Sequence, residues 1–399
     1  GVIFSAMSII QALAFMIGMG SGNYMTRSLG AGKRELAEQI VSIAFFTGII
    51  MGLVITVSAT FNIHRVVLLL GATETIAPYA EAYAHYIFIA APFMICSFIM
   101  NNLLRFQGKA SFAMVGITVG GLLNIALDPL FIFTLDMGTA GAALATGLSQ
   151  FISFCILLWM CNHQDSCISI SIRKFRPKLA IYREVLYGGI PSLGRQGIAS
   201  VATILMNFMC QPYGDAAIAA MSIVSRFMFF INSVIIGFGQ GFQPVCSYCF
   251  GAGLYDRVKK ACWFCIRVST IILLVLSVIS FPAARSIITL FRRNDPTVIE
   301  IGTLALRLQL ITLPLQGAVI MGNMMPQSIG YGFRATLVST ARQGIFLIPL
   351  LTIMTYTIGL LGIQCAQPLA DIATFILSLF VIRGIFKEFP EDASSFAAQ

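Results

Sequence analysis

The feature that most constrains this chain is a succession of apolar runs, each long enough to cross a lipid bilayer. A membrane-spanning helix needs about 20 consecutive apolar residues, and the 399-residue chain contains about eleven such runs. Hydrophobic residues are 58% of the chain and charged residues only 10%, a balance outside the range of soluble domains of this size. Because helices satisfy their own backbone hydrogen bonds in a bilayer, the sequence predicts an all-α polytopic membrane protein. The runs lie at 1–29, 36–60, 76–104, 112–135, 139–161, 184–212, 216–248, 259–281, 297–326, 335–356 and 359–386.

Basic residues between the runs set the expected orientation. The formal net charge is +9, and Lys and Arg gather in the connections, most densely at 173–183. If the spans alternate in direction, most of these connections fall on one side, which the positive-inside rule makes cytoplasmic. We therefore expect a multi-pass protein with a cytoplasmic C-terminus, whose basic residues fix topology rather than bind nucleic acid.

The chain also contains an internal repeat at an offset of 221 residues, the separation of Gly18 and Gly239. Further matches follow in order near that offset, with a small adjustment at the proline pair. A parallel repeat of this kind indicates two lobes related by an axis along the membrane normal, as in one large class of secondary transporters. The matched pairs are Gly30/Gly251, Pro92/Pro314, Asn101/Asn323, Gly108/Gly330, Pro129/Pro349 and Gly138/Gly359.

The repeat places the lobe boundaries. It assigns five helices to an N-lobe at 1–165, a cytoplasmic linker to 166–183, and six helices to a C-lobe at 184–390. A repeat preserves orientation only if each half has an even number of helices. We therefore expect two pseudo-symmetric six-helix lobes in an intact protein of twelve spans, with a first helix before Gly1 that is missing from this chain.

One acidic residue lies deep inside a span. Asp128 follows Asn124 by four residues in the run 112–135, so both side chains share one helix face. Pro129 comes next, and it removes a backbone donor and frees a carbonyl one turn back. An acid in a span marks a functional site by default, and this set suits a small cation or a proton. The alternative is a helix cap or a structural ion pair with an arginine.

Other polar groups lie at depth in the second half. Arg195 and Gln196 follow the Pro191 kink, and Gln367 and Asp371 share one face of the last span, together with Gln364 one turn earlier. Because an intramembrane Arg and Asp usually pair, we predict an Arg195–Asp371 ion pair that holds the lobe together. The alternative is that these residues line the substrate cavity.

The remaining polar patterns give weaker signals. Glu81 and His85, four residues apart, suggest a proton relay, although a position near the outer headgroups is the favoured interpretation. Two Cys-x2-Cys pairs, at 246–249 and 262–265, have zinc-like spacing. Their flanks are apolar, so we interpret them as packing residues and predict no metal site. The three histidines lie near span ends and far apart in sequence, which makes an enzyme improbable.

In their order along the chain, several motifs resemble the multidrug and toxic compound extrusion (MATE) family, in its MepA-like bacterial branch. The resemblance covers essentially the whole chain. The motifs are Arg27-Ser28-Leu29-Gly30-Ala31-Gly32, Arg105-Phe106-Gln107-Gly108, Asn124-x3-Asp128-Pro129, Gly138-x2-Gly141, Gly188-Gly189-Ile190-Pro191-Ser192 and Gln240-Gly241-Phe242-Gln243-Pro244.

The resemblance implies a twelve-helix antiporter in a bacterial inner membrane, which exchanges H+ or Na+ for amphipathic, mostly cationic drugs by alternating access. It implies a cation-coupling site at Asn124 and Asp128, with Thr146 at the matching spacing of the next helix. The family's first-helix aspartate has no counterpart here, and Glu184 and Glu300 lie too near the span ends for the C-lobe acid site of some members. We expect a monomer with no cofactor besides the transported ion.

A flippase for a lipid-linked saccharide is the alternative, because related folds perform that work. Such a protein should line its cavity with several basic residues for phosphate. Arg195 is expected to be nearly alone as a basic residue of the cavity, which favours the antiporter.

Overall fold

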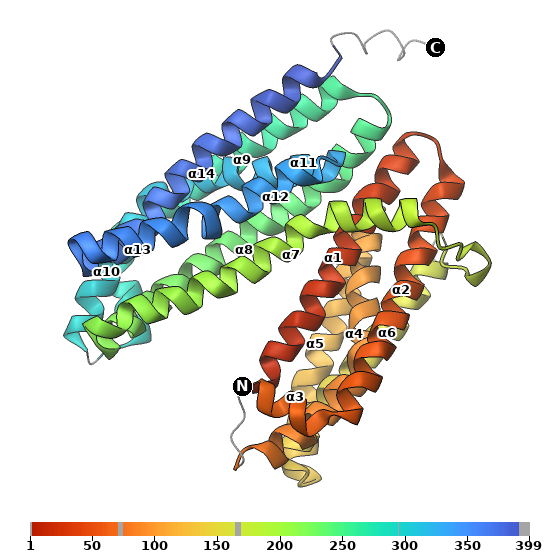
Figure 1. The fold of residues 1–399 in the computed structure, drawn as a ribbon, viewed down its shortest axis with the longest axis horizontal. Coiled ribbons are helices and arrows are strands. Elements are labelled where there is room, and N and C mark those ends of the chain that lie inside the picture. Colours follow the sequence, from red (N-terminus) through yellow and green to blue (C-terminus); the bar gives the residue numbers. More distant parts are fainter. Residues whose placement is uncertain (1, 71–74, 164–168, 294, 391–399) are drawn as a thin grey trace. The chain divides into compact units, whose positions relative to one another are not determined.

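The computed structural model describes residues 2–70, 75–163, 169–293 and 295–390, and these residues form helices joined by short connections (Figure 1). Ten helical segments in this described part are long and apolar enough to cross a membrane. The run predicted at 184–212 lies in the continuous helix α7 (Leu179–Cys210), which contains Pro191 and is not among these ten segments. The predicted all-α polytopic fold is confirmed.

The chain divides into two compact units, residues 1–193 and 194–399. The first unit contains a bundle of long helices that lie side by side (Figure 1). Its central helix is α4, which packs against α1, α2 and α6 and buries residues along its whole length. Its elements are α1 (Val2–Gly30), α2 (Arg34–Phe61), α3 (Ile63–Leu69), α4 (Ala77–Phe106), α5 (Ala110–Pro129), the π-helical turn η1 (Leu130–Thr134), α6 (Gly138–His163), the short η2 (Ile172–Lys174) and the first part of α7.

The second unit repeats this plan, with two of its spans built from joined segments. A 3-10 turn joins α10 to α11, a π-helical segment joins α12 to α13, and the last helix packs against both spans. Its elements are the second part of α7, η3 (Gln211–Tyr213), α8 (Asp215–Gly251), α9 (Tyr255–Phe291), α10 (Pro296–Thr312), η4 (Leu313–Leu315), α11 (Gln316–Ile329), α12 (Gly332–Thr340), η5 (Ala341–Phe346), α13 (Leu347–Ile358) and α14 (Leu360–Glu388).

Matching hydrogen bonds show the repeat in three dimensions. Asn101 Nδ2 donates to the carbonyl of Ala113 at 2.8 Å, and Asn323 Nδ2 donates to the carbonyl of Ala335 at 2.8 Å. A buried hydroxyl likewise donates to a carbonyl on another helix in each unit. These second bonds are Thr26 to Phe106 at 3.0 Å and Ser247 to Ser328 at 3.1 Å. The repeat thus preserves how the helices are fastened together, and the predicted pseudo-symmetric lobes are confirmed.

Turns are matched as well. Three pairs of glycines at matching positions of the repeat adopt positive φ, a conformation that L side chains rarely take. Glycine at these places ends one helix and redirects the chain into the next, so both halves turn at the same points of the repeat. The pairs are Gly32/Gly253 at φ 72° and 74°, Gly108/Gly330 at 80° and 92°, and Gly138/Gly359 at 55° and 66°.

The division between the units falls inside α7, at Leu193 and Gly194, rather than in the linker that precedes it. The reason is close packing of the first part of α7 on α1. A Cβ on Gly20 would lie 1.9 Å from the carbonyl oxygen of Val185, so only glycine permits this approach. The sequence-based lobe limits at 165, 184 and 390 stay a prediction.

Polar contacts fasten the same segment within the first unit. Arg27 Nη2 lies 3.4 Å from Glu184 Oε2, and the Thr47 and Tyr182 hydroxyls are 2.9 Å apart. Lys174 forms an ion pair with Glu38. The connection that leads into α7 is therefore held on α1 and α2 by charge as well as by packing.

Candidate functional site

The three residues predicted to couple transport to a cation meet in the first unit. Asn124 Nδ2 donates to Asp128 Oδ1 at 3.3 Å and to Thr146 Oγ1 at 3.4 Å. The Thr146 hydroxyl donates to the carbonyl of Ala142 at 3.0 Å. All three predicted side chains are half-buried. We call Asn124, Asp128 and Thr146 the Asp128 cluster.

The Asp128 carboxylate has no basic partner among the residues that the structure describes, since none of their Lys, Arg or His nitrogens lies within 4.0 Å of it. The alternative interpretation as a structural ion pair with an arginine therefore finds no support in the geometry. A half-buried carboxylate among neutral neighbours offers its oxygens to a cation from solution. Its role in coupling stays a prediction.

The backbone beside Asp128 is irregular, as the proline predicted. Pro129 ends α5 without a backbone N–H, which leaves the carbonyl of Ile125 without its usual helical donor. The chain then runs through the π-helical turn η1 before it leaves the helix. π-helical turns occur often at functional sites. Carboxylate, hydroxyl and freed carbonyl oxygens are the ligands that a hard cation such as Na+ prefers.

Asp371 has a different partner from the one predicted. Arg342 Nε donates to Asp371 Oδ1 at 2.8 Å, and Gln367 Nε2 donates to the same oxygen at 2.9 Å. Arg195 Nη1 instead donates to Asn323 Oδ1 at 3.4 Å. The predicted Arg195–Asp371 ion pair is therefore wrong. Arg195 extends from α7 toward α11, whereas the π-helical segment η5 brings Arg342 to the face of α14 that carries Asp371.

The other predicted residues of this region take separate positions. Gln364 Nε2 donates to the carbonyl of Ile301 at 3.0 Å, which joins α14 to α10. Gln196 is half-buried on α7 next to Arg195. It stays a prediction that a substrate cavity is lined by Arg195, Gln196, Gln367 and Asp371.

Four arginines within spans of the second unit were not singled out from the sequence, namely Arg226, Arg267, Arg307 and Arg342. Each stands in an apolar segment, and that signal alone is enough to single out an intramembrane charge. Arg307 lies over the ring of Phe281 at 5.5 Å. The count of intramembrane basic residues is therefore higher than the argument against a flippase assumed.

The proton relay suggested for Glu81 and His85 is not formed. Glu81 Oε1 lies 2.6 Å from His64 Nδ1 on α3, and His85 packs edge-on against Tyr86. The Glu81–His64 contact links α3 to α4 at a solvent-accessible position, which agrees with the favoured interpretation of a peripheral pair.

The Cys246/Cys249 and Cys262/Cys265 pairs are buried in one hydrophobic cluster formed by α8, α9, α11 and α14. No group of three or more His, Cys, Asp or Glu side chains in the described part of the chain has a metal-binding arrangement.

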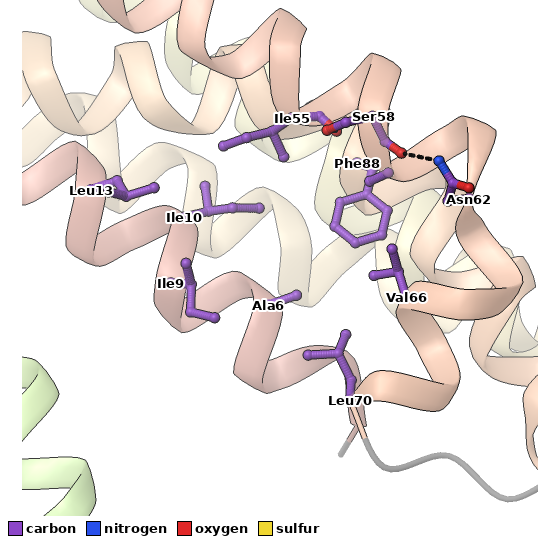
Figure 2. Close-up of a pocket in the computed structure, with 11 residues that line it drawn as sticks. Ala6, Ile9, Ile10, Leu13, Ile55, Ser58, Asn62, Val66, Leu70 and Phe88 are labelled. Carbon is purple, nitrogen blue, oxygen red and sulfur yellow. Dashed lines mark hydrogen bonds between the residues drawn. The ribbon is translucent and has the colours of Figure 1, made fainter.

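A cavity of about 430 Å³ opens between α1, α2, α3 and α4 in the first unit (Figure 2). Its wall is almost wholly aliphatic, and Phe88 lies at its centre in the view of Figure 2. The polar groups in it are Ser58 and Asn62, whose Nδ2 donates to the carbonyl of Ser58 at 3.4 Å. Its lining contains no charged side chain and no member of the Asp128 cluster, so the cavity is separate from that cluster.

Comparison with known proteins gives consistent matches. The MatE family model matches residues 1–130 and 191–353. The multidrug export protein MepA of Staphylococcus saprophyticus is 28% identical over 375 residues, which is 94% of this chain and 82% of that protein. MepA of Staphylococcus aureus strain N315 is 29% identical over 378 residues, with the same coverage. A crystal structure of MATE in complex with MaL6 superposes with a TM-score of 0.91 at 25% identity, and covers 97% of this chain and 87% of that one.

Proposed function

The chain belongs to the MatE family, and on that premise we propose that it is a cation-coupled antiporter, which exports amphipathic, mostly cationic drugs or toxic metabolites by alternating access. Its relatives include multidrug export proteins, so it is a multidrug efflux transporter and not an enzyme. H+ or Na+ supplies the driving force in this proposal, and no other cofactor takes part.

The observation that carries the coupling proposal is the geometry of the Asp128 cluster. One carboxylate contacts the Asn124 amide, which also contacts the Thr146 hydroxyl, and no guanidinium or ammonium compensates its charge. A carboxylate in a span is costly to leave charged and unpaired. Binding a cation or a proton removes that cost, and releasing it restores the cost, so occupancy of Asp128 is linked to the conformation of the lobe.

Substitution of Asp128 tests this proposal. We expect Asp128→Asn to insert normally and to reduce the rate of gradient-driven efflux of ethidium from liposomes at least tenfold, which corresponds to a barrier higher by about 1.4 kcal/mol. Applying a pH gradient and a Na+ gradient separately identifies the ion. The matched control is Asp136→Asn, because Asp136 is an exposed carboxylate eight residues further on whose positive φ asparagine also adopts.

Efflux by Asp128→Asn at the wild-type rate would remove this residue from the mechanism. Failure of the Asn protein to insert, with normal insertion of the Asp136 control, would support the structural role instead.

A lipid-linked saccharide is the alternative cargo, and one observation favours it. Arg195, Arg226 and Arg307 lie in spans of the second unit, and within the described residues none has a carboxylate within 4.0 Å. Guanidinium groups suit phosphate. The same liposomes, loaded with a fluorescent polyprenyl-phosphate lipid and quenched from outside, measure whether the lipid crosses the bilayer. Lipid transfer without dye efflux would favour the flippase.

A further inference from the structure

The second unit holds a buried carboxylate that the proposed transport cycle does not use. Asp371 is 1% exposed, and its Oδ1 accepts hydrogen bonds from Arg342 Nε and Gln367 Nε2 at 2.8 and 2.9 Å. Its Oδ2 is buried and has no hydrogen-bond partner among the residues that the structure describes. We call Arg342, Gln367 and Asp371 the Asp371 cluster. Its contact with the arginine is therefore one-sided, unlike a two-bond guanidinium–carboxylate pair.

The repeat relates this cluster to the Asp128 cluster. At the offset of 221 given by Gly138 and Gly359, Thr146 corresponds to Gln367, and both side chains take part in their lobe's cluster. The proline pair, offset by 220, makes Ile348 the counterpart of Asp128. The acid is thus absent from the equivalent position in the second lobe, and a carboxylate appears on the following helix instead.

A π-helical segment lies at each cluster. The turn η1 directly follows Asp128, and η5 contains Arg342 itself. The first interrupts the regular backbone hydrogen bonding at the end of α5, and the second does so between α12 and α13, which is the matching span of the second lobe. Each cluster therefore contains a carboxylate, a neutral side chain from the last span of its lobe (α6 or α14), and irregular backbone in the span before it.

They differ in charge. The carboxylate of the Asp128 cluster has no cationic neighbour within 4.0 Å among the described residues, whereas that of the Asp371 cluster contacts a guanidinium. An arginine remains protonated under all physiological conditions. The positive charge beside Asp371 is thus permanent and covalently attached, while any positive charge at Asp128 has to arrive from solution.

We infer that the Arg342 guanidinium takes the place that a coupling cation would occupy beside Asp371. It thereby blocks a second cation site formed by Asp371 and Gln367. The inference rests on the proposed coupling role of Asp128. Its consequence is that ion exchange is confined to the first lobe, since the equivalent site of the second lobe is always occupied. Removing the guanidinium should expose Asp371 and create a new site for Na+ or H+.

The test measures ion-dependent thermal stabilisation of the purified protein in detergent. Na+ replaces choline at constant pH, and in a second series the pH is lowered without Na+. An ion that binds only the folded protein raises its Tm. We expect Asp128→Asn to abolish the response of the wild type, and Asp128→Asn/Arg342→Gln to regain a shift of similar size. Adding Asp371→Asn should abolish it again.

Arg342→Lys is the matched control, because it keeps the charge and should leave the Asp128→Asn protein unresponsive. If Arg342→Gln does not yield folded protein in choline at pH 8, recovery of folded protein by Na+ or by acid supports the inference, and failure of both to recover it overturns the inference. A folded Asp128→Asn/Arg342→Gln protein that responds to neither ion also overturns it.

The two proposals fail separately. A wild-type protein whose Tm responds to neither ion would count against coupling at Asp128. A new response of Asp128→Asn/Arg342→Gln would still establish that Asp371 forms a cation site that Arg342 blocks in the wild type.

Discussion

Replacing Gly20 by alanine should loosen the attachment of α7 to α1. A Cβ at this position would lie 1.9 Å from the carbonyl oxygen of Val185, whereas an ordinary contact begins at 3.4 Å, so the two helices must separate by 3.4 − 1.9 = 1.5 Å. The oxygen belongs to the backbone and cannot turn aside. The same shift would stretch the 3.4 Å Arg27–Glu184 contact past the limit of an ion pair.

Overpacking of this kind costs about 1–3 kcal/mol, and we expect Tm to fall by about 2–10 °C. The measurement is the loss of monodisperse protein on heating, followed by fluorescence-detected size exclusion in detergent. Gly121→Ala is the control, because a Cβ on this α5 glycine meets nothing within 4 Å and alanine is the better helix former. Equal Tm values for Gly20→Ala and Gly121→Ala would refute the close approach of α1 and α7.

Two further substitutions test the repeat. Asn323→Ala removes a hydrogen bond between spans and also the acceptor of Arg195, so it should lower the free energy of unfolding by about 2–3 kcal/mol. The matched Asn101→Ala should lower it by about 1 kcal/mol, because the lost bond involves no charged group. Equal losses of Tm would show that Arg195 does not depend on Asn323. Gly330→Ala places a side chain at φ 92° and should cost about 1–2 kcal/mol, while Gly241→Ala, in open space on a regular helix, should cost nothing measurable in the same thermal assay.

The sequence alone determined the spans, the repeat and the Asp128 cluster. Length and hydropathy define a membrane helix with little help from its neighbours, because the backbone bonds of a span close within the span. Asn124 and Asp128 are four residues apart on one helix, so their contact follows from local geometry. Thr146 was located by resemblance, and the short connection from α5 to α6 makes these helices neighbours.

The tertiary structure decided the contacts between distant spans. Arg195 and Arg342 both lie in apolar segments. Asp371 pairs with Arg342 because η5 packs on α14, whereas Arg195 extends from α7 to Asn323. Likewise, the units separate inside α7 because Gly20 lets α1 approach it closely. Which charge meets which carboxylate depends on helix rotation, depth and packing distance, and these are set by the assembled lobe rather than by the periodicity of any one span.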